Sequence, residues 1–139
     1  MKLADESLDY WIKTAEAILH RAFPAGSRAI VHATRIAAAV EDRLKPIAFL
    51  HDVVEDTNIT LEDLKQEGFP SYIIDAVDLL THRENEPNMV YWKRILTNKD
   101  AIRVKLTDIN DNINDAPSEH ARKKYAIALD LFKQAGYSL

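Results

Sequence analysis

The sequence contains no cysteine, and it has only 3 glycines and 5 prolines among 139 residues. Without cysteine there is no disulfide framework, no thiolate nucleophile and no sulfur ligand for a metal. The scarcity of glycine and proline favours a chain made of helices. No apolar run approaches the roughly 20 residues that a membrane-spanning helix requires, so we expect no membrane partner.

Positive charge is also in short supply. Lysine and arginine total 18 against 22 aspartates and glutamates, and the net charge at pH 7 is −4. Because nucleic-acid binders usually neutralise phosphates with a basic surface, we expect no nucleic-acid partner. The first residues, "MKLADESLDYW", carry acids where a signal peptide carries basic residues and an apolar stretch. We therefore expect a cytoplasmic protein in which an anionic substrate needs a local basic patch or a metal.

Apolar residues recur at three- and four-residue spacing along most of the chain, as on one face of a helix. Ser27, Thr60 and Asp100 stand where predicted helices start, and Gly68 and Gly136 where predicted helices end. The length suits one domain with its own core, covering residues 1–139. The sequence thus predicts an all-α, single-domain bundle of about seven or eight helices. They cover residues 5–22, 27–42, 45–56, 60–68, 70–82, 89–98, 101–115 and 118–136.

The segment "KPIAFLHDVVEDT" places one histidine and three acids, His51, Asp52, Glu55 and Asp56, in an otherwise apolar helical run. On one continuous helix, Glu55 and Asp56 would lie one turn beyond His51 and Asp52. Carboxylates beside an apolar face are costly unless they are solvated, paired or bound to a cation. One interpretation is a solvated pair of His51 with Glu55, and the other is a cation site.

Two further stretches bear on this choice. "IVHATRIAAAV" places His32 on a strongly apolar helix, where a histidine can also be a core residue with a satisfied ring. "VKLTDINDNIND" places Asp108 and Asn112 four residues apart after an apolar helix start. Two histidines and two aspartates on three helices form a nitrogen and oxygen donor set that suits Mn²⁺, Fe²⁺ or Mg²⁺. The lack of a sulfur ligand disfavours a structural zinc site.

An isolated His, a His-Asp pair and a late Asp on separate helices resemble the HD superfamily of metal-dependent phosphohydrolases. "HDVVEDT", "TLEDLKQEGFP", "AVDLLTHRENE" and "VKLTDINDN" are similar to the hydrolase domain of RelA/SpoT-type proteins, and most closely to its small stand-alone versions. The similarity covers roughly residues 16–115. It implies an HD-type helical bundle that binds a divalent metal, with Mn²⁺ first and Fe²⁺ or Mg²⁺ as alternatives. The implied metal ligands are His32, His51, Asp52 and Asp108.

The same resemblance implies roles for the remaining polar residues. Glu55 and Asp56 would position or deprotonate the attacking water, and Asn112 would help to hold the substrate ribose or phosphate. Asp56 is alternatively an acceptor that orients a ligand histidine. The implied reaction removes pyrophosphate from the 3′ position of guanosine tetra- or pentaphosphate.

The chain departs from the family in the loop before His32. There the relatives carry an arginine that packs on the guanine base, nine residues before the first metal histidine; this chain has Phe23 at that position. Arg21 and Arg28 are the candidates for a substitute substrate contact. Lys105 is either a phosphate contact or a side chain that snorkels from a half-buried helix.

Three functions remain open from the sequence. The first is a phosphohydrolase of a small nucleotide, resembling a (p)ppGpp 3′-pyrophosphohydrolase. The second is a nucleotidase or deoxynucleotide phosphohydrolase with the same metal site, and the third is a non-catalytic nucleotide-binding module. Because a purely structural metal site needs no additional acids, Glu55 and Asp56 favour an enzyme.

Other motifs have two interpretations each. His82 and Arg83 in "THRENE" are either phosphate contacts or part of a helix end and a solvated loop. We expect Tyr91 and Trp92 in the core rather than on a base-stacking surface, and "HARKKY" at 120–125 on a solvated face. Apolar positions on the first and last helices leave a homo-oligomer possible.

Overall fold

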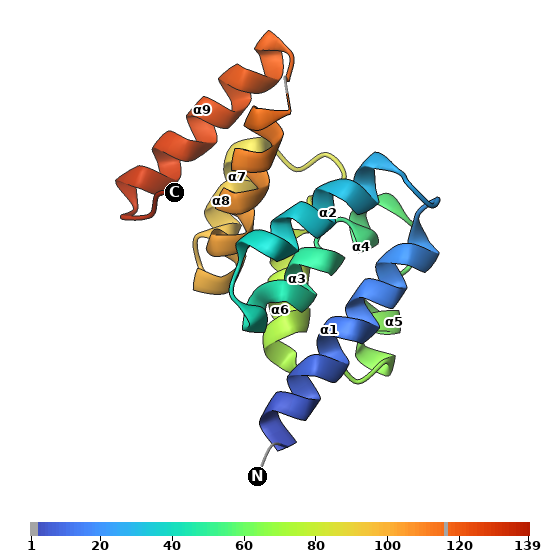
Figure 1. Ribbon diagram of the computed structural model, residues 1–139. Coiled ribbons are helices and arrows are strands. Elements are labelled where there is room, and N and C mark those ends of the chain that lie inside the picture. The colour runs from blue at the N-terminus through green and yellow to red at the C-terminus, as the bar shows by residue number, and fades with distance from the viewer. Residues whose placement is uncertain (1–2, 116) are drawn as a thin grey trace.

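The computed structural model describes residues 3–115 and 117–139, and within these ranges helices are joined by loops and there is no strand (Figure 1). The predicted all-α class is thus confirmed. The elements are α1 (Leu3–Ala22), α2 (Arg28–Ala39), the 3-10 helix η1 (Asp42–Leu44), α3 (Lys45–Leu50), α4 (Val53–Asp56), α5 (Leu61–Gln66), α6 (Ser71–Leu80), α7 (Asn88–Ile95), α8 (Lys99–Asn114) and α9 (Glu119–Gln134).

Side-chain caps start several of these helices. Ser27 caps α2 by accepting from the backbone N–H three residues on, and Thr60 opens α5 with a capping box. The prediction for Asp100 is wrong, because α8 begins earlier and is capped by Asn98. Asp100 lies in the first turn instead, where it accepts two hydrogen bonds from Arg43 at 2.9 and 2.7 Å. A short polar side chain one position before the helix, as at Asn98, caps as well as aspartate does.

The helix expected over residues 45–56 is interrupted in the structure. It forms α3 and the four-residue α4, and His51 and Asp52 lie in the turn between them. The backbone of Asp52 (φ −107°, ψ −4°) departs from α-helical values. Nδ1 of His51 donates to the carbonyl oxygen of Ala48 at 2.6 Å, an oxygen that a continuous helix would use for the Asp52 N–H. The break therefore adds one short segment to the eight helices expected.

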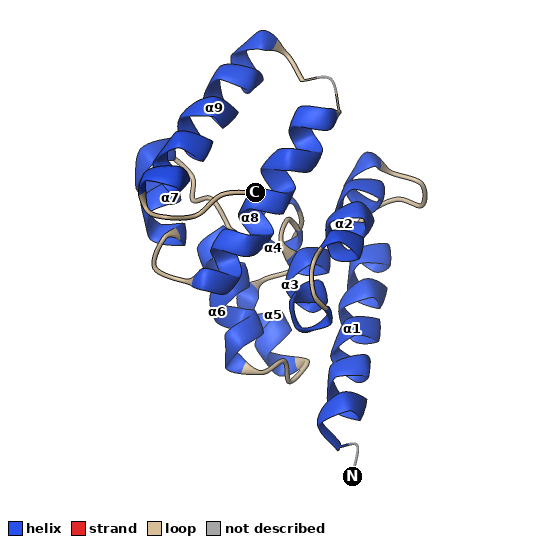
Figure 2. Cartoon of the chain, turned by 60° about the vertical axis from the view of Figure 1, so that its left-hand side comes forward, coloured by secondary structure: helices blue, strands red, loops and turns tan. Residues whose placement is uncertain are grey.

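The core forms around α3, whose residues 46–50 are all buried. This helix packs against α1, α2 and α6, while α8 packs against α2, α6 and α9. Figure 2 shows α2, α3 and α8 converging, with α1 and α9 on opposite sides of this junction. The large side chains that fill the core are apolar, among them Ile36, Ile47, Leu50, Ile73 and Ile102. The polar residues on the inner faces of α2 and α8 are thus brought against the end of α3.

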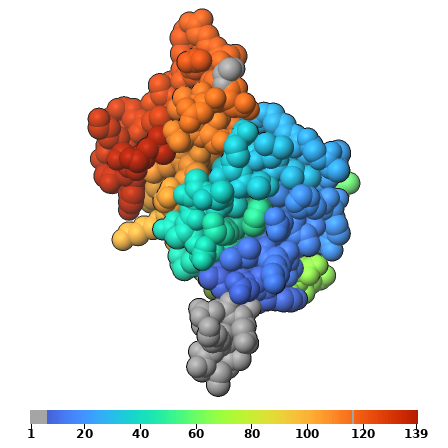
Figure 3. Space-filling model, in the orientation of Figure 1, coloured from blue at the N-terminus to red at the C-terminus, as the bar shows by residue number. Residues whose placement is uncertain are grey.

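The first and the last helices lie on different sides of the molecule. In the space-filling view α9 (red) stands beside α8 (orange), away from α1 and α2 (Figure 3). None of the helices in residues 3–115 and 117–139 combines the length and the apolar character needed to cross a membrane. The cytoplasmic location stays a prediction, as does a homo-oligomer. The exposed large apolar side chains are dispersed over several elements: Tyr10, Val31, Met89, Val90, Ile127 and Leu139.

Candidate metal centre

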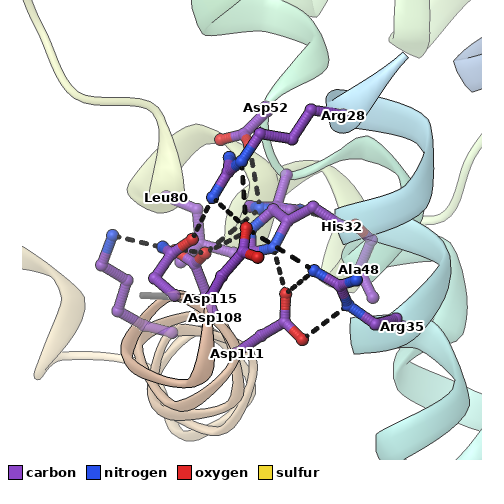
Figure 4. A network of polar contacts seen from close by, with 12 residues as sticks. Arg28, His32, Arg35, Ala48, Asp52, Leu80, Asp108, Asp111 and Asp115 are labelled. Atoms are coloured by element: carbon purple, nitrogen blue, oxygen red, sulfur yellow. Dashed lines mark hydrogen bonds and ion pairs between the residues drawn. The ribbon is translucent and has the colours of Figure 1, made fainter. Parts of the chain in front are cut away.

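Three buried side chains from distant parts of the chain meet where α2, α3 and α8 converge. They are His32 of α2, His51 after α3 and Asp108 of α8, and we call them the floor. One ligand atom of each lies within 4.8 Å of the others. The two imidazole rings are 5.4 Å apart between centroids. This group could hold a metal ion, and Figure 4 shows His32 and Asp108 side by side in the network of polar contacts.

The protonation of the His51 ring is set by the backbone. Since a carbonyl oxygen only accepts, Nδ1 carries the proton that is donated to Ala48, and Nε2 is the nitrogen that would offer a lone pair to a cation. Nε2 lies 3.1 Å from Oδ2 of Asp52 and 3.7 Å from Oδ1 of Asp108. Within the described residues it is nevertheless buried without a hydrogen-bond partner. A buried nitrogen that faces two carboxylates without bonding to either is the arrangement expected of a metal ligand.

His51 also reports the electrostatic character of the floor. Burial opposes a charged imidazole, but the negative charges of Asp52 and Asp108 outweigh it and hold the pKa of His51 well above its ordinary value. The same negative potential that favours an imidazolium favours a divalent cation among these ligands.

His32 is oriented by a carboxylate outside the floor. Its Nδ1 donates to Oδ2 of Asp111 at 2.6 Å, and Asp111 in turn accepts two hydrogen bonds from Arg35 at 2.8 and 3.0 Å. Nε2 of His32 then faces Oδ1 of Asp108 at 2.7 Å. Two acceptors this close are stabilised by a shared cation or a shared proton. A carboxylate behind a histidine is the usual support for a metal-binding imidazole.

Asp108 is charged although it is buried. Burial alone would raise its pKa, but Lys105 together with His32 and His51 lowers it well below the ordinary value. Nζ of Lys105 lies 3.1 Å from Oδ2 of Asp108, and this carboxylate raises the pKa of Lys105 against the effect of burial. Asn112 donates to Oδ1 of the same carboxylate at 3.1 Å. Lys105 therefore holds Asp108 ionised, as metal ligation requires.

A second acidic group stands at the mouth of the site. The carboxylates of Asp52, Glu55 and Asp56, which we call the rim, also approach within 4.8 Å of one another. Burial alone would raise the pKa of Asp52, but His51 lowers it overall. The pKa of Asp56 is raised by burial and by the charges of Asp52 and Glu55. Oε1 of Glu55 accepts a hydrogen bond of 2.7 Å from the backbone N–H of His82.

Floor and rim open into one cleft of about 300 Å³. Lys124, Tyr125 and Ala128 of α9 form part of its wall, and Tyr91 and Trp92 of α7, both buried, form another. With the exception of Arg21, which lies outside it, the residues expected to bind the metal, the water or the substrate line this cleft together. They are Arg28, His32, His51, Asp52, Glu55, Asp56, Lys105, Asp108 and Asn112.

Arg28 reaches the cleft but is engaged with α8. Its guanidinium donates to Asp115 at 3.2 Å and to Asn112 at 3.4 Å, in an exposed position at the start of α2. These bonds join the ends of α2 and α8 across the opening of the site. Phe23 is not among the cleft residues.

Several residues of the site escaped the sequence interpretation. Asp111 and the carbonyl of Ala48 orient the two histidines, which corrects the alternative that Asp56 does so. The signal for Asp111 was its position three residues after Asp108, on a neighbouring face of the same helix. The solvated face expected for residues 120–125 is wrong for Lys124 and Tyr125, since both line the cleft. No local pattern marks them, because only the packing of α9 brings them there.

Comparison with known proteins adds no assignment. The chain matches no protein-family model and no curated protein. The chemistry of the site therefore rests on the donor set. Two imidazoles and a buried carboxylate form a group that could hold a metal ion.

Proposed function

We propose that this protein is a metal-dependent phosphohydrolase of a small nucleotide. The observation that carries the proposal is His51. Its ring is buried, its Nδ1 proton is committed to a carbonyl, and its Nε2 faces Asp52 and Asp108 without a hydrogen bond. A structural histidine in a core would instead satisfy both ring nitrogens.

The proposed ligands are His32, His51, Asp52 and Asp108, with Mn²⁺ as the first choice of metal and Fe²⁺ or Mg²⁺ as alternatives. When bound, the cation supplies a Lewis acid that screens phosphoryl charge and makes water a stronger nucleophile at neutral pH. Asp111 and Ala48 keep the lone pairs of the two imidazoles directed at the site. Lys105 keeps Asp108 anionic.

The rim provides the proton acceptors that hydrolysis requires. Glu55 and Asp56 both face the cleft beside Asp52. One oxygen of Glu55 is fixed by the His82 amide, which directs the carboxylate at the space above the floor. We assign Glu55 the role of accepting the proton of the attacking water, with Asp56 beside it as a second acceptor.

The walls of the cleft suit a phosphorylated ligand. Arg28, Lys105 and Lys124 bring three positive side chains from α2, α8 and α9 to a protein whose net charge is −4. The volume lies at the lower end of the range for small-molecule sites. Arg28, Lys105 and Asn112 are the proposed contacts to substrate phosphate or ribose.

The favoured substrate is a guanosine 3′-pyrophosphate of the (p)ppGpp type, by the resemblance of the "HDVVEDT" and "VKLTDINDN" segments. The second candidate, another nucleotide hydrolysed at the same metal, is favoured by Phe23. This residue stands where the relatives place the arginine that packs on guanine.

The test is turnover by protein stripped of metal and reloaded with Mn²⁺. The panel contains ppGpp, pppGpp, GTP, ATP, deoxynucleoside triphosphates and nucleoside monophosphates, with products separated by ion exchange. His51→Ala and Asp108→Asn are compared with His20→Ala, which changes an exposed histidine outside the cleft. Release of GDP and pyrophosphate from ppGpp, lost in the first two variants only, supports the favoured substrate. Turnover of another nucleotide with the same dependence keeps the metal chemistry and changes the substrate. Mn²⁺ binding without any turnover overturns the proposal in favour of a binding module.

A further inference from the structure

The position of Glu55 is not fixed by its own helix. The segment α4 is only four residues long, and Glu55 is exposed on it. The contact that orients its carboxylate comes from a residue 27 positions further on, the backbone N–H of His82 at 2.7 Å. A charge-assisted bond of this length is strong enough to select one rotamer of an exposed glutamate. The geometry of Glu55 thus depends on where the chain places His82.

His82 is the second residue of the segment 81–87 that joins α6 to α7, which we call the 81–87 loop. Its imidazole stacks on the ring of Tyr91, with centroids 4.3 Å apart and planes 4° from parallel. Its Nε2 donates to the backbone carbonyl of Glu86 at 2.7 Å. Tyr91 is itself buried, and its hydroxyl donates to the carbonyl of Leu80 at 2.6 Å. The His82 ring is therefore held on one face by Tyr91 of α7 and at its edge by the loop.

One ion pair closes this loop. Arg94 of α7 donates to both carboxylate oxygens of Glu86, from Nε at 2.7 Å and from Nη2 at 2.8 Å. The same guanidinium donates to the carbonyl of Thr81 at 3.1 Å, so it binds the first residue of the loop as well as Glu86 near its end. Glu86 also accepts from the backbone N–H of Arg83 at 3.1 Å. Between Arg83 and Glu86, Asn85 turns the chain with a positive φ of 62°. A bidentate ion pair between arginine and a carboxylate fixes the orientation of both side chains.

We propose that Glu86 and Arg94 are positioning residues for Glu55. Their ion pair fixes the 81–87 loop so that the His82 amide holds the Glu55 carboxylate over the metal floor. The inference rests on the proposed function for its catalytic consequence, but the structural chain from Arg94 to Glu86, His82 and Glu55 stands on the contacts alone. Neither Glu86 nor Arg94 lines the cleft, so their effect is expected to reach the reaction only through Glu55.

The first experiment measures the contact directly. In ¹H–¹⁵N spectra, the His82 amide is expected to resonate downfield and to exchange slowly with solvent, because it donates to a carboxylate. Glu55→Gln identifies this signal by shifting it. Glu86→Gln and Arg94→Lys are both expected to shift it and to speed its exchange. The control is Asp100→Asn, which changes an equally bidentate pair with Arg43 that involves no residue of the loop or of α7. An unchanged His82 amide in Glu86→Gln and Arg94→Lys overturns the inference, whether or not the protein turns over any nucleotide.

The second experiment measures the consequence for turnover. Misplacement of a reacting group by about 1 Å costs up to about 100-fold in rate, so we expect Glu86→Gln to lower kcat by about 10- to 100-fold. KM and Mn²⁺ affinity are expected to stay those of the parent. In the double variant Glu55→Gln/Glu86→Gln, kcat is expected to equal that of Glu55→Gln alone, because Glu86 acts through Glu55.

A loss that multiplies in the double variant, or a kcat in Glu86→Gln equal to that of the parent, overturns the inference and leaves the proposed function in place. A parent protein that binds Mn²⁺ without turnover overturns the proposed function instead, and the amide measurement still decides the structural claim.

Discussion

The floor and the rim line the same cleft, but their side chains are held in place in different ways. His32, His51 and Asp108 are 3%, 3% and 6% exposed, and each has a second partner that fixes it within packed helices. Glu55 and Asp56 are exposed on a four-residue helix. The floor is thus positioned by the core, whereas Glu55 of the rim is positioned by a loop contact. This difference predicts that variants of the floor change metal binding, whereas variants of Glu55 and Asp56 change turnover alone.

The largest effect should come from breaking the floor. We expect His51→Ala to lose Mn²⁺ binding by more than the 10- to 100-fold typical of an outer-sphere change, and to lose turnover with it. Titration calorimetry with Mn²⁺ on the stripped protein measures the first and product release the second. His20→Ala is expected to behave as the parent. Retention of parent-like Mn²⁺ affinity in His51→Ala would place the metal elsewhere.

The second-largest effect is expected from Glu55→Gln, which changes the rim. The expected result is a fall in kcat of about 10²- to 10⁴-fold, as for loss of a general base, with Mn²⁺ affinity unchanged. Single-turnover kinetics and calorimetry on the same preparation separate the two effects. If Mn²⁺ affinity falls together with kcat, Glu55 contributes to metal binding, and the separate roles of the floor and of Glu55 are refuted.

A smaller effect is expected from the support behind His32. Asp111→Asn weakens the acceptor that orients this ring, so we expect Mn²⁺ affinity to fall by about 10- to 100-fold while the fold is kept. Asp115→Asn is the matched control, because Asp115 also lies near Arg35, at 3.9 Å, but contacts no histidine among the described bonds. Equal Mn²⁺ affinities in the two variants would remove Asp111 from the metal site.

The smallest effect concerns the pH dependence of stability at the ion pair of Glu86 and Arg94. Hydrogen bonds from Arg94 lower the pKa of Glu86 from 4.5 to about 2. Because the pKa is lower in the folded protein, the carboxylate stabilises the fold fully above the ordinary value, and this contribution is lost as pH falls toward about 2. Urea unfolding is therefore expected to show the parent as slightly more stable than Glu86→Gln at neutral pH, with the difference shrinking through this window. A difference that grows on acidification would contradict the assigned direction.

Much of the fold could be predicted from the sequence, because helix periodicity and caps are local signals. Ser27 and Thr60 cap helices as expected. The break at His51 could not be predicted, since it accompanies a side chain that takes a backbone carbonyl of its own helix. The prediction for Asp100 was wrong for a related reason. Asn98, two residues earlier, is an equally good cap, and Asp100 instead pairs with Arg43, a contact between distant parts of the chain.

The candidate site shows the same division. The residue types of the floor could be proposed from their apolar surroundings and from the family resemblance, and the structure brings all of them to one cleft. The partners that orient them could not be predicted, because Asp111 contacts His32 across 79 positions of sequence. The same holds for the His82 amide and for Tyr125, which reach the cleft only through the packing of α6, α7 and α9.

The distance in sequence between His32 and Asp108, 76 positions, has a consequence for how the molecule comes into being. A contact of this span closes a long stretch of chain, and such contacts form late and slowly compared with helical turns. Neither histidine lies close to Asp108 until α8 has packed against α2 and the end of α3. Uptake of a metal ion at the floor is therefore a marker of completed assembly, and nascent chains that have not yet produced α8 lack the means to capture one there.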